Sequence, residues 1–296
     1  MRSEKEMMDL IKQAAEDEPC IRAAYIEGSR ANPNVPGDIF QDYDIVYVVT
    51  ETKPFRENRE WINRFGERLY MQYPEDGVYF PSDVENCYGW LMQLADGNRL
   101  DLHVCTKEYA LNHLELYRVI IDKDGIMPKA QETSDERYWV KKPQYEEFQC
   151  TCNEFWWCLN NVAKGLWRDE LPYVMDMLDF NIRPMLKRLL EWKIGCQHDF
   201  SLNIGKSAKY MKNYLSAEEY QQFLATYARA QKENIWDAVF SMCQLFQAVA
   251  MEVGGELNFD YDYKEAGNSR GYLEQIRTLP ADAEKICQKI FAELKN

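Results

Sequence analysis

The chain has 296 residues, of which 46% are hydrophobic, and it contains 19 Tyr, 13 Phe and 8 Trp but only 11 Pro. This length allows two domains with separate apolar cores, and this composition excludes an intrinsically disordered chain. The formal net charge of −14 disfavours a broad nucleic-acid surface and favours a cationic small molecule, although solubility alone also explains it.

The sequence lacks signals that would take it into or across a membrane. No stretch approaches the roughly 20 uninterrupted apolar residues of a membrane span. Residues 1–18 are charged, unlike a secretory signal. Nine cysteines are present, and the one close group, Cys150, Cys152 and Cys158, has no CxxC pair or nearby His for zinc. We therefore expect a cytoplasmic protein with free, mostly buried thiols. No feature predicts its oligomeric state.

The first half of the chain predicts a mixture of helices and strands. Ser3 and Glu6 form a capping box before a helix that ends ahead of Pro19. Strands are predicted over residues 21–27 and 43–49, with Gly28-Ser29-Arg30 and a loop rich in Asn and Pro between them. Residues 55–73 have helical spacing. Two further strands, 88–94 and 99–105, form a predicted hairpin around Asp96-Gly97-Asn98.

After Lys141-Lys142-Pro143 the pattern changes to long windows of helical spacing. Predicted helices cover about 145–167, 171–194, 216–231 and 235–253, and the third opens on a capping box of Ser216 and Glu219. We therefore predict an α+β protein with a mixed-sheet catalytic domain over residues 1–142 and an all-α domain over residues 143–296.

The most informative stretch is Asp42-Tyr43-Asp44 at the start of an apolar strand. Residues two apart on a strand share a face, so the two carboxylates project together, and they repel each other unless a cation lies between them. Magnesium prefers such oxygen ligands and often bridges one or two carboxylates to substrate phosphates. The preceding Gly28, Ser29 and Arg30 suit phosphate, because they offer close backbone approach, a hydroxyl and a positive charge.

A third carboxylate, Asp101, lies between Leu100 and Leu102 on a predicted strand and therefore needs a polar destination. If this strand pairs near residues 43–49, Asp101 joins Asp42 and Asp44 as a metal ligand and accepts the proton of an attacking hydroxyl. Each feature also has an ordinary explanation, namely a simple turn, a common strand start or a hydrogen-bonded edge residue. Their joint occurrence favours a site.

Several short segments carry a resemblance to a known family: residues 1–10 (MRSEKEMMDL), 27–32 (EGSRAN), 40–45 (FQDYDI), 121–124 (IDKD), 153–156 (NEFW) and 233–236 (ENIW). Together they resemble the aminoglycoside 6-adenylyltransferase (streptomycin adenylyltransferase) family of antibiotic-resistance nucleotidyltransferases. The similarity covers about the first 255 residues, and the C-terminal tail matches less well.

The resemblance implies an N-terminal nucleotidyltransferase fold, a C-terminal helical domain and an ATP site in the cleft between them. It also implies that Asp42, Asp44 and Asp101 hold Mg²⁺, and that Gly28 with Ser29 cradles the triphosphate of ATP. Residues 204–209 (IGKSAK) do not form a P-loop, because Phe200 stands where that motif needs glycine. Lys206 is still a candidate for the triphosphate, as a helical-domain lysine is in similar enzymes, against a solvated surface lysine.

The helical half offers acidic candidates for a cationic acceptor. Glu154 lies in an aromatic run and is the first candidate, and Asp176 and Asp179 are weaker ones. Glu154 is also the alternative to Asp101 as general base.

The leading hypothesis is a magnesium-dependent adenylyltransferase that moves AMP from ATP to a hydroxyl of streptomycin and so confers antibiotic resistance. It predicts an aminoglycoside and ATP as partners, without nucleic acid or membrane. One alternative keeps the fold and changes the acceptor to a lincosamide, another aminocyclitol or a protein hydroxyl. Another is a non-catalytic nucleotide-binding module, which the presence of all three carboxylates disfavours.

Overall fold

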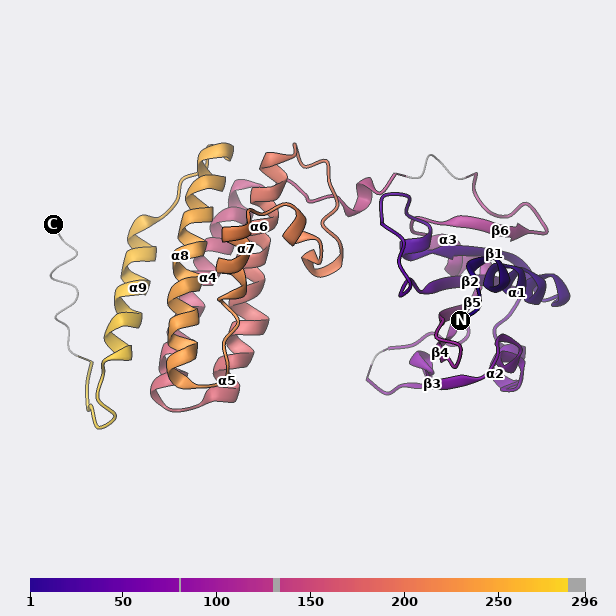
Figure 1. Ribbon diagram of the computed structural model, residues 1–296, viewed down its shortest axis with the longest axis horizontal. Coiled ribbons are helices and arrows are strands. Elements are labelled where there is room, and N and C mark those ends of the chain that lie inside the picture. Colours follow the sequence, from indigo (N-terminus) through magenta and orange to yellow (C-terminus); the bar gives the residue numbers. More distant parts are fainter. Residues whose placement is uncertain (80, 130–133, 287–296) are drawn as a thin grey trace. The chain divides into compact units, whose positions relative to one another are not determined.

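The computed structural model describes residues 1–79, 81–129 and 134–286, and the chain forms two compact units, Met1–Asp135 (unit 1) and Glu136–Asn296 (unit 2) (Figure 1). Within the described residues, unit 1 contains every strand and unit 2 is helical. The α+β class is therefore confirmed. The predicted boundary between residues 142 and 143 lies inside unit 2, in the extended segment before its first long helix.

Unit 1 is built on a six-stranded mixed sheet with the strand order β3-β4-β5-β2-β1-β6. The strands are β1 (Ile21–Glu27), β2 (Tyr43–Val49), β3 (Arg68–Gln72), β4 (Cys87–Leu94), β5 (Arg99–Thr106) and β6 (Arg118–Asp122). The pair β2 and β5 is parallel, and the other neighbouring pairs are antiparallel. This arrangement brings the end of β1 and the starts of β2 and β5 to one edge of the sheet.

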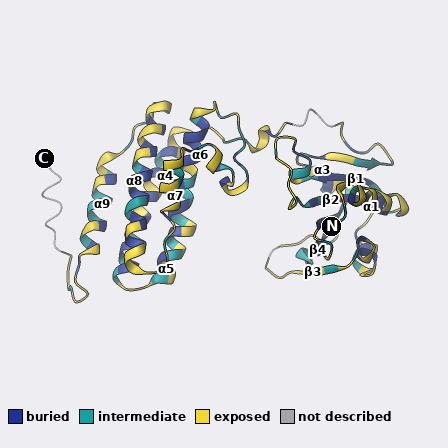
Figure 2. Cartoon of the chain, in the orientation of Figure 1, coloured by how far each residue is buried: buried dark blue, intermediate teal, exposed yellow. Residues whose placement is uncertain are grey.

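Helices cover both faces of this sheet. On one face, α1 (Glu4–Asp17) contributes Met7 and Ile11 to a core shared with β1, β2, β4 and β5. On the other face, α3 (Lys107–Asn112) contributes Ala110 to a smaller core. The predicted capping box of Ser3 and Glu6 is confirmed at the start of α1. Figure 2 shows how the buried residues concentrate inside each unit.

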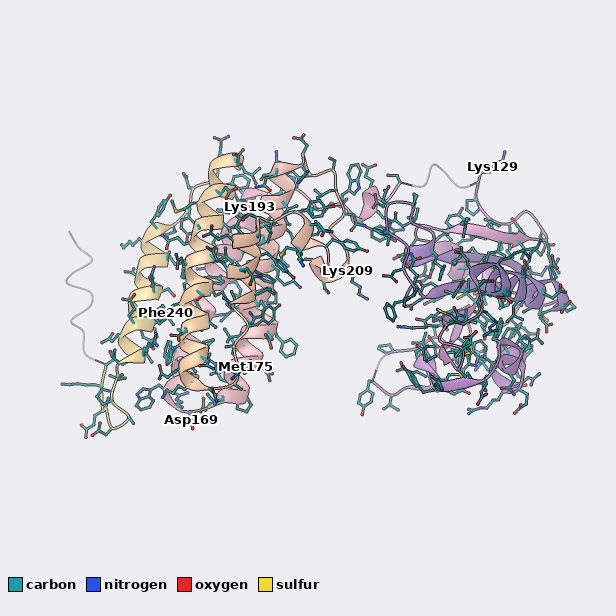
Figure 3. All side chains as sticks on the ribbon, viewed as in Figure 1. Lys129, Asp169, Met175, Lys193, Lys209 and Phe240 are labelled. Carbon is teal, nitrogen blue, oxygen red and sulfur yellow. The ribbon has the colours of Figure 1, made fainter. Side chains whose placement is uncertain are left out.

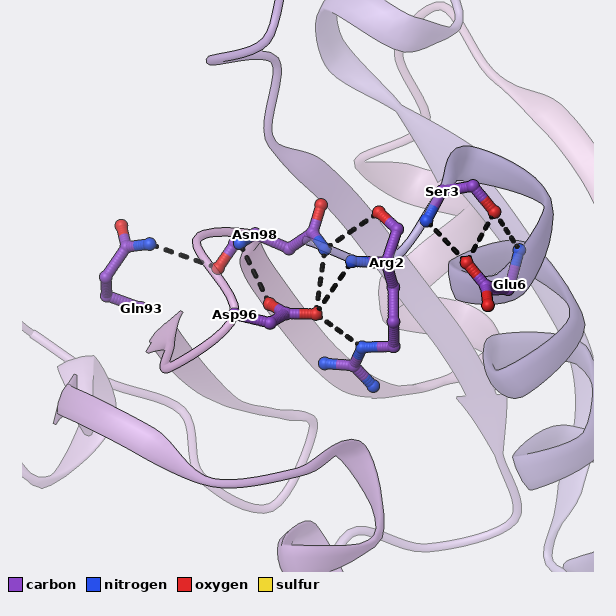
Figure 4. A network of polar contacts seen from close by, with 6 residues as sticks. All are labelled: Arg2, Ser3, Glu6, Gln93, Asp96 and Asn98. Atoms are coloured by element: carbon purple, nitrogen blue, oxygen red, sulfur yellow. Dashed lines mark hydrogen bonds and ion pairs between the residues drawn. The ribbon is translucent and has the colours of Figure 1, made fainter.

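The predicted hairpin is confirmed as β4 and β5, with Gly97 at φ +93° in the turn. The same turn anchors the N-terminus, because Arg2 Nε donates to Asp96 Oδ2 at 2.6 Å and Asn98 Nδ2 donates to the Arg2 carbonyl at 3.2 Å (Figure 4). The turn between β4 and β5 therefore also fixes the position of the residues that precede α1.

The predicted helix over residues 55–73 is wrong. This stretch forms α2 (Lys53–Glu57), the 3-10 turn η2 (Trp61–Phe65) and strand β3. Gly66 ends η2 at φ +114°, a backbone conformation that few other residues adopt. The spacing of the aromatic residues reflects tertiary packing instead of a helix. Phe55, Trp61 and Phe65 form an aromatic cluster with Tyr47 and Trp90. Strand β6 was also not predicted from the sequence.

Unit 2 is a helical bundle around one apolar core. Its helices are α4 (Tyr145–Trp167), α5 (Leu171–Asp176), α6 (Arg183–Gln197), α7 (Ala217–Leu224), α8 (Lys232–Leu257) and α9 (Tyr263–Arg277). At the centre, the ring of Phe155 stacks on that of Phe246 with 3.6 Å between centroids. Short turns η4 (Glu136–Tyr138), η6 (Lys206–Ala208) and η7 (Met211–Asn213) connect the bundle.

The helices of unit 2 differ from the predicted ones in four respects. The predicted helix over 171–194 contains a π-helical turn, η5 (Met177–Ile182), directly before α6, where Pro184 lacks the backbone N–H that a regular helix needs. The predicted helix over 216–231 keeps its capping box but ends at Leu224. Helix α8 continues past Gly254 and Gly255 and ends at Asn258, which adopts φ +55°. Helix α9 was not predicted.

Buried polar groups also hold the bundle together. Lys193 of α6, labelled in Figure 3, is 7% exposed. Its ammonium pairs with Glu219 of α7 and, at 2.6 Å, with Glu252 of α8. A buried charge is tolerated only when it is paired in this way. Helix α8 is long and apolar enough to span a membrane, but 56% of its most apolar window is buried inside unit 2, as in a core helix of a globular protein.

Candidate active site

Three carboxylates lie side by side on the central strands of the unit 1 sheet, near the ends of those strands. Asp44 at the start of β2 is the register partner of Glu27 at the end of β1, and also the register partner of Asp101 on β5. Directly opposed residues on neighbouring strands project from the same face. The parallel pairing of β2 with β5 therefore brings Asp101 beside Asp44, which is the position expected if its strand pairs near residues 43–49. Asp42 lies in the loop immediately before β2.

The guanidinium of Arg99 lies against two of these acids. Its Nε and Nη2 donate to the two carboxylate oxygens of Asp101 at 2.9 and 2.6 Å, and its Nη1 lies 3.4 Å from Asp42 Oδ2. Such a bidentate pair fixes the orientation of the carboxylate as well as its charge. Arg99 therefore orders Asp101, which is only 9% exposed, and balances part of the local negative charge.

Neither Asp44 nor Glu27 has a side-chain hydrogen bond or an ion pair among the residues that the structure describes. Burial, followed by the charges of Asp101 and Asp42, raises the pKa of Asp44 to about 6. Burial, followed by the charges of Asp44 and Glu115, raises the pKa of Glu27 to about 7. Both shifts have the same cause, since desolvated carboxylates that repel one another hold their protons more tightly.

The turn that follows β1 packs closely on Asp44. Gly28 adopts φ +67°, and a Cβ at this position would lie 2.1 Å from Asp44 Oδ2. Glycine is therefore needed here for both its conformation and its lack of a side chain. Gly28 is exposed, and the hydroxyl of Ser29 has no hydrogen bond within the described part of the chain. The turn can thus receive a polar ligand next to the carboxylates.

The guanidinium of Arg30, which was predicted to contact phosphate, contacts other groups of unit 1. Its Nε and Nη2 donate to the carbonyls of Asp42 and Gln41, each at 3.0 Å, and its guanidinium lies 3.9 Å from the centre of the Tyr43 ring. Its Nη1 is 3.3 Å from Glu4 Oε2. These contacts use the guanidinium to hold the loop that carries Asp42.

The residues fit magnesium by their chemistry. Among the described residues no group of three or more His, Cys, Asp or Glu side chains is placed to hold a metal ion by itself. A magnesium site shared with substrate phosphates can use one or two carboxylates. Asp42, Asp44 and Asp101 provide the hard oxygen donors that Mg²⁺ prefers. The pKa of Asp44 is raised first by burial and then by the charges of Asp101 and Asp42, which a cation would offset.

The candidates in the helical half form a separate group within unit 2. Glu154 on α4 is exposed, accepts from the Cys158 thiol at 3.1 Å and lines a cavity of about 890 Å³. Lys206, in η6, is exposed and follows Gly205, which lines the same cavity. Asp176 is exposed at the end of α5, and Asp179 pairs with Arg183 at 3.1 Å; neither lines this cavity.

Two neighbours of the unit 1 acids were missed as site residues. Glu27 stood inside the EGSRAN segment, and its position as the last strand residue before a glycine was the available signal. Arg99 lies two residues before Asp101, and this spacing on a strand puts both side chains on one face. Neither signal is specific without knowledge of which strands are neighbours.

Comparison with known proteins adds independent information. Residues 1–276 match the family described as streptomycin adenylyltransferase. The chain is 39% identical over 270 residues to aminoglycoside 6-adenylyltransferase of Bacillus subtilis (strain 168), covering 90% of this chain and 95% of that protein. It is 32% identical over 265 residues to aminoglycoside 6-adenylyltransferase of Staphylococcus aureus, covering 88% and 94%. The crystal structure of an aminoglycoside 6-adenyltransferase from Bacillus subtilis shares 34% identity, covers 94% of this chain and 100% of its own, and has a TM-score of 0.47.

Replacing Asp44 with Asn should stabilise unit 1 at pH 8, by about 1–3 kcal/mol at about 1.4 kcal/mol per pKa unit. The folded-state pKa of Asp44, about 6, lies above its ordinary value of 3.8. The wild-type protein therefore loses stability as pH rises through this window, and the Asn variant does not. The gain in melting temperature should shrink as pH falls from 8 to 4.

Thermal unfolding of both proteins in EDTA across this pH range measures the effect. Glu51→Gln, at an exposed side chain, is the control and should behave like wild type at every pH. An Asp44→Asn variant that is less stable than wild type at pH 8 would contradict the assignment of Asp44 as a repelled, unpaired carboxylate.

Proposed function

We propose that this chain, which belongs to the streptomycin adenylyltransferase family, transfers AMP from ATP to a hydroxyl group of streptomycin in a magnesium-dependent reaction. As a member of this family it is a nucleotidyltransferase of the aminoglycoside 6-adenylyltransferase type, with ATP and an aminoglycoside as substrates. The observation that carries the finer proposal is the register of Asp44 and Asp101 on adjacent strands beside Gly28. We also propose that it acts in the cytoplasm, where ATP is supplied.

Magnesium would be held by Asp42, Asp44 and Asp101 together with phosphate oxygens of ATP. It would supply positive charge to the phosphates and to the departing pyrophosphate. Asp44 can take this role directly because it has no other partner among the described residues. Asp42 and Asp101 are both paired with the guanidinium of Arg99. Some of these contacts would have to break before the two carboxylates could bind the metal.

The reaction forms a bond between the acceptor hydroxyl oxygen and the α-phosphorus of ATP, and it breaks the bond from that phosphorus to the leaving pyrophosphate. The hydroxyl proton must pass to a base. We assign this proton to Asp101, whose carboxylate is oriented by Arg99 on the same strand and borders Asp44. Glu154 lies in unit 2 and is assigned to the acceptor instead.

Gly28 and Ser29 are proposed to receive the triphosphate, supported by the exposed glycine and the unbonded Ser29 hydroxyl. Lys206, an exposed residue of unit 2, is kept as a candidate for the triphosphate on the family resemblance alone. Arg30 is better supported as an anchor of the Asp42 loop than as a phosphate ligand, because its guanidinium is engaged within unit 1.

The acceptor is proposed to bind through acidic residues of unit 2. Glu154 has the best support, since its exposed carboxylate lines the large cavity. Asp176 and Asp179 have weaker support, because they lie outside that cavity and Asp179 is already paired with Arg183. The net charge of −14 is consistent with a polycationic acceptor.

The direct test mixes the purified protein with ATP and MgCl₂ and offers streptomycin, kanamycin, spectinomycin, lincomycin and a serine-containing peptide separately. Pyrophosphate release and a mass increase of one AMP on the acceptor score the reaction. We expect both with streptomycin, and loss of both in EDTA. Modification of another acceptor in preference to streptomycin would replace the proposed substrate, and full activity in EDTA would remove magnesium from the proposal.

Substitution separates the two candidate bases. Asp101→Asn should lower kcat by at least about 100-fold, the loss typical of removing a general base, because it removes the proposed proton acceptor and a metal ligand. Glu154→Gln should instead raise the KM for streptomycin with a smaller effect on kcat, because its carboxylate contacts the cation. Steady-state kinetics of both variants measure this difference. The reverse pattern would transfer the base role to Glu154.

Gly28→Ala should lower kcat/KM by about 100-fold, since the new Cβ displaces the Asp44 carboxylate and small displacements of reacting groups cost about that much. Gly125→Ala is a matched control. Gly125 has nearly the same backbone strain, at φ +66°, but open space where its Cβ would be. Comparable activity of the two variants would show that the close packing of Gly28 on Asp44 has no part in the reaction.

A further inference from the structure

Two cysteines of unit 1 face each other across the β4–β5 hairpin. Cys87 begins β4, Cys105 lies near the end of β5, and the two are register partners in this antiparallel pair. Both thiols are free, and the Cys105 thiol donates a hydrogen bond to the Cys87 sulfur with 3.3 Å between the two Sγ atoms. They belong to the smaller core of unit 1, to which α3 contributes Ala110. The proposed transfer of AMP uses neither thiol.

The pairing of the two strands gives these cysteines a backbone geometry that suits a disulfide. Directly beside them, the Thr106 N–H donates to the Asn86 carbonyl across the pair at 2.9 Å. Opposed residues in an antiparallel pair alternate between a hydrogen-bonded and a non-hydrogen-bonded type, so Cys87 and Cys105 form the second type, whose Cα atoms lie about 4.5 Å apart. Disulfides usually join Cα atoms that are roughly 4.4 to 6.8 Å apart. The two sulfurs therefore need to approach by only about 1 Å to reach bonding distance.

Two free thiols held in this way can be joined by a two-electron oxidant without a change of strand register. We propose that Cys87 and Cys105 are an oxidation site, at which hydrogen peroxide converts the two thiols into a reversible disulfide that joins β4 to β5 and stabilises unit 1. The site is independent of the proposed function, because it concerns the stability of unit 1 and not the transfer of AMP.

The hydrogen bond between the thiols gives them different roles in the reaction. This bond to Cys87, followed by burial, raises the pKa of the Cys105 thiol, so Cys105 keeps its proton. Cys87 loses its proton and its sulfur attacks one peroxide oxygen, which breaks the O–O bond and yields a sulfenic acid and water. The Cys105 sulfur then attacks the Cys87 sulfur, the S–S bond forms as the S–O bond breaks, and the Cys105 proton leaves with hydroxide as a second water. The two thiols lose two electrons, and the peroxide gains them.

Burial limits the rate of this oxidation. Cys87 is 8% exposed and Cys105 is 4% exposed. Thiols that are nearly buried react slowly, so the reaction depends on local opening of the core beneath α3. The same packing protects the disulfide once it has formed. We therefore expect an oxidised form that accumulates slowly and persists until a reductant is added.

A disulfide at this position should stabilise unit 1. It would close a loop between residues that are 18 positions apart in the chain, around the turn between β4 and β5. Because the folded strands are already adjacent, the bond mainly restricts the unfolded chain. We expect oxidation to raise the melting temperature of unit 1 by about 5 °C or more.

The test treats the full-length protein with hydrogen peroxide and compares wild type, Cys105→Ala and Cys20→Ser. Cys20 is a half-buried cysteine of the same unit and serves as the control. After the remaining thiols are alkylated, mass spectrometry of a digest identifies which peptides are joined. We expect a disulfide between Cys87 and Cys105 in wild type and in Cys20→Ser. Calorimetry should show the higher melting temperature in these two proteins and not in Cys105→Ala, and dithiothreitol should reverse it.

Two results would overturn the proposal. In the first, Cys87 and Cys105 of wild type remain unlinked after peroxide has fully oxidised the exposed Cys150. In the second, the disulfide forms but the melting temperature of unit 1 is unchanged or lower, which would show that the bond strains the hairpin. Both results come from the comparison of oxidised with reduced wild type, so they do not depend on the folding of Cys105→Ala.

Discussion

Repulsion between carboxylates at the edge of the unit 1 sheet is the constraint around which the rest of this site is arranged. Glu27, Asp44 and Asp101 occupy directly opposed positions on three adjacent strands, with Asp42 close by. Arg99 balances Asp101 and Asp42, and Arg30 holds the loop that leads into Asp44. Asp44 has no ion pair among the described residues, and its pKa is raised first by burial and then by the charges of Asp101 and Asp42. The proposed binding of a metal-nucleotide complex would offset this repulsion.

The remainder of unit 1 supplies the stability that this arrangement needs. Beyond Asp44, β2 is buried on both faces, and the residues after Asp101 on β5 are buried almost as completely. Buried apolar strands fix the register firmly, because a shift by one residue would turn every side chain to the other face. The acids are thereby held next to one another by hydrophobic packing that lies farther along the same strands.

Unit 2 contains a buried charge of its own. Its buried Lys193 is paired with two glutamates, so this charge is structural. Glu154 of α4, by contrast, is an exposed acid that lines the cavity of the same unit. The charge of Lys193 is thus already neutralised inside the bundle, whereas the carboxylate of Glu154 is accessible.

The sequence by itself determined those features that depend on near neighbours along the chain. The turn at Asp96-Gly97-Asn98, the capping boxes at Ser3 and Ser216 and the change from mixed to helical spacing all follow from residues within a few positions of each other. The α+β class and the family resemblance could therefore be predicted, and so could Asp42 and Asp44 as a pair, because an i, i+2 spacing on a strand is local.

Only the tertiary structure decided which distant residues meet. The parallel pairing of β2 with β5 places Asp101 beside Asp44, and it also makes Arg99 and Glu27 part of the group. The aromatic spacing over residues 55–73 predicted a helix, but Trp61 and Phe65 pack against Tyr47 and Trp90 from a 3-10 turn that Gly66 ends. The cavity that Glu154 lines forms where four segments of unit 2 converge. Strand neighbours, burial and charge pairing are set by packing across the whole fold, which periodicity within one segment does not encode.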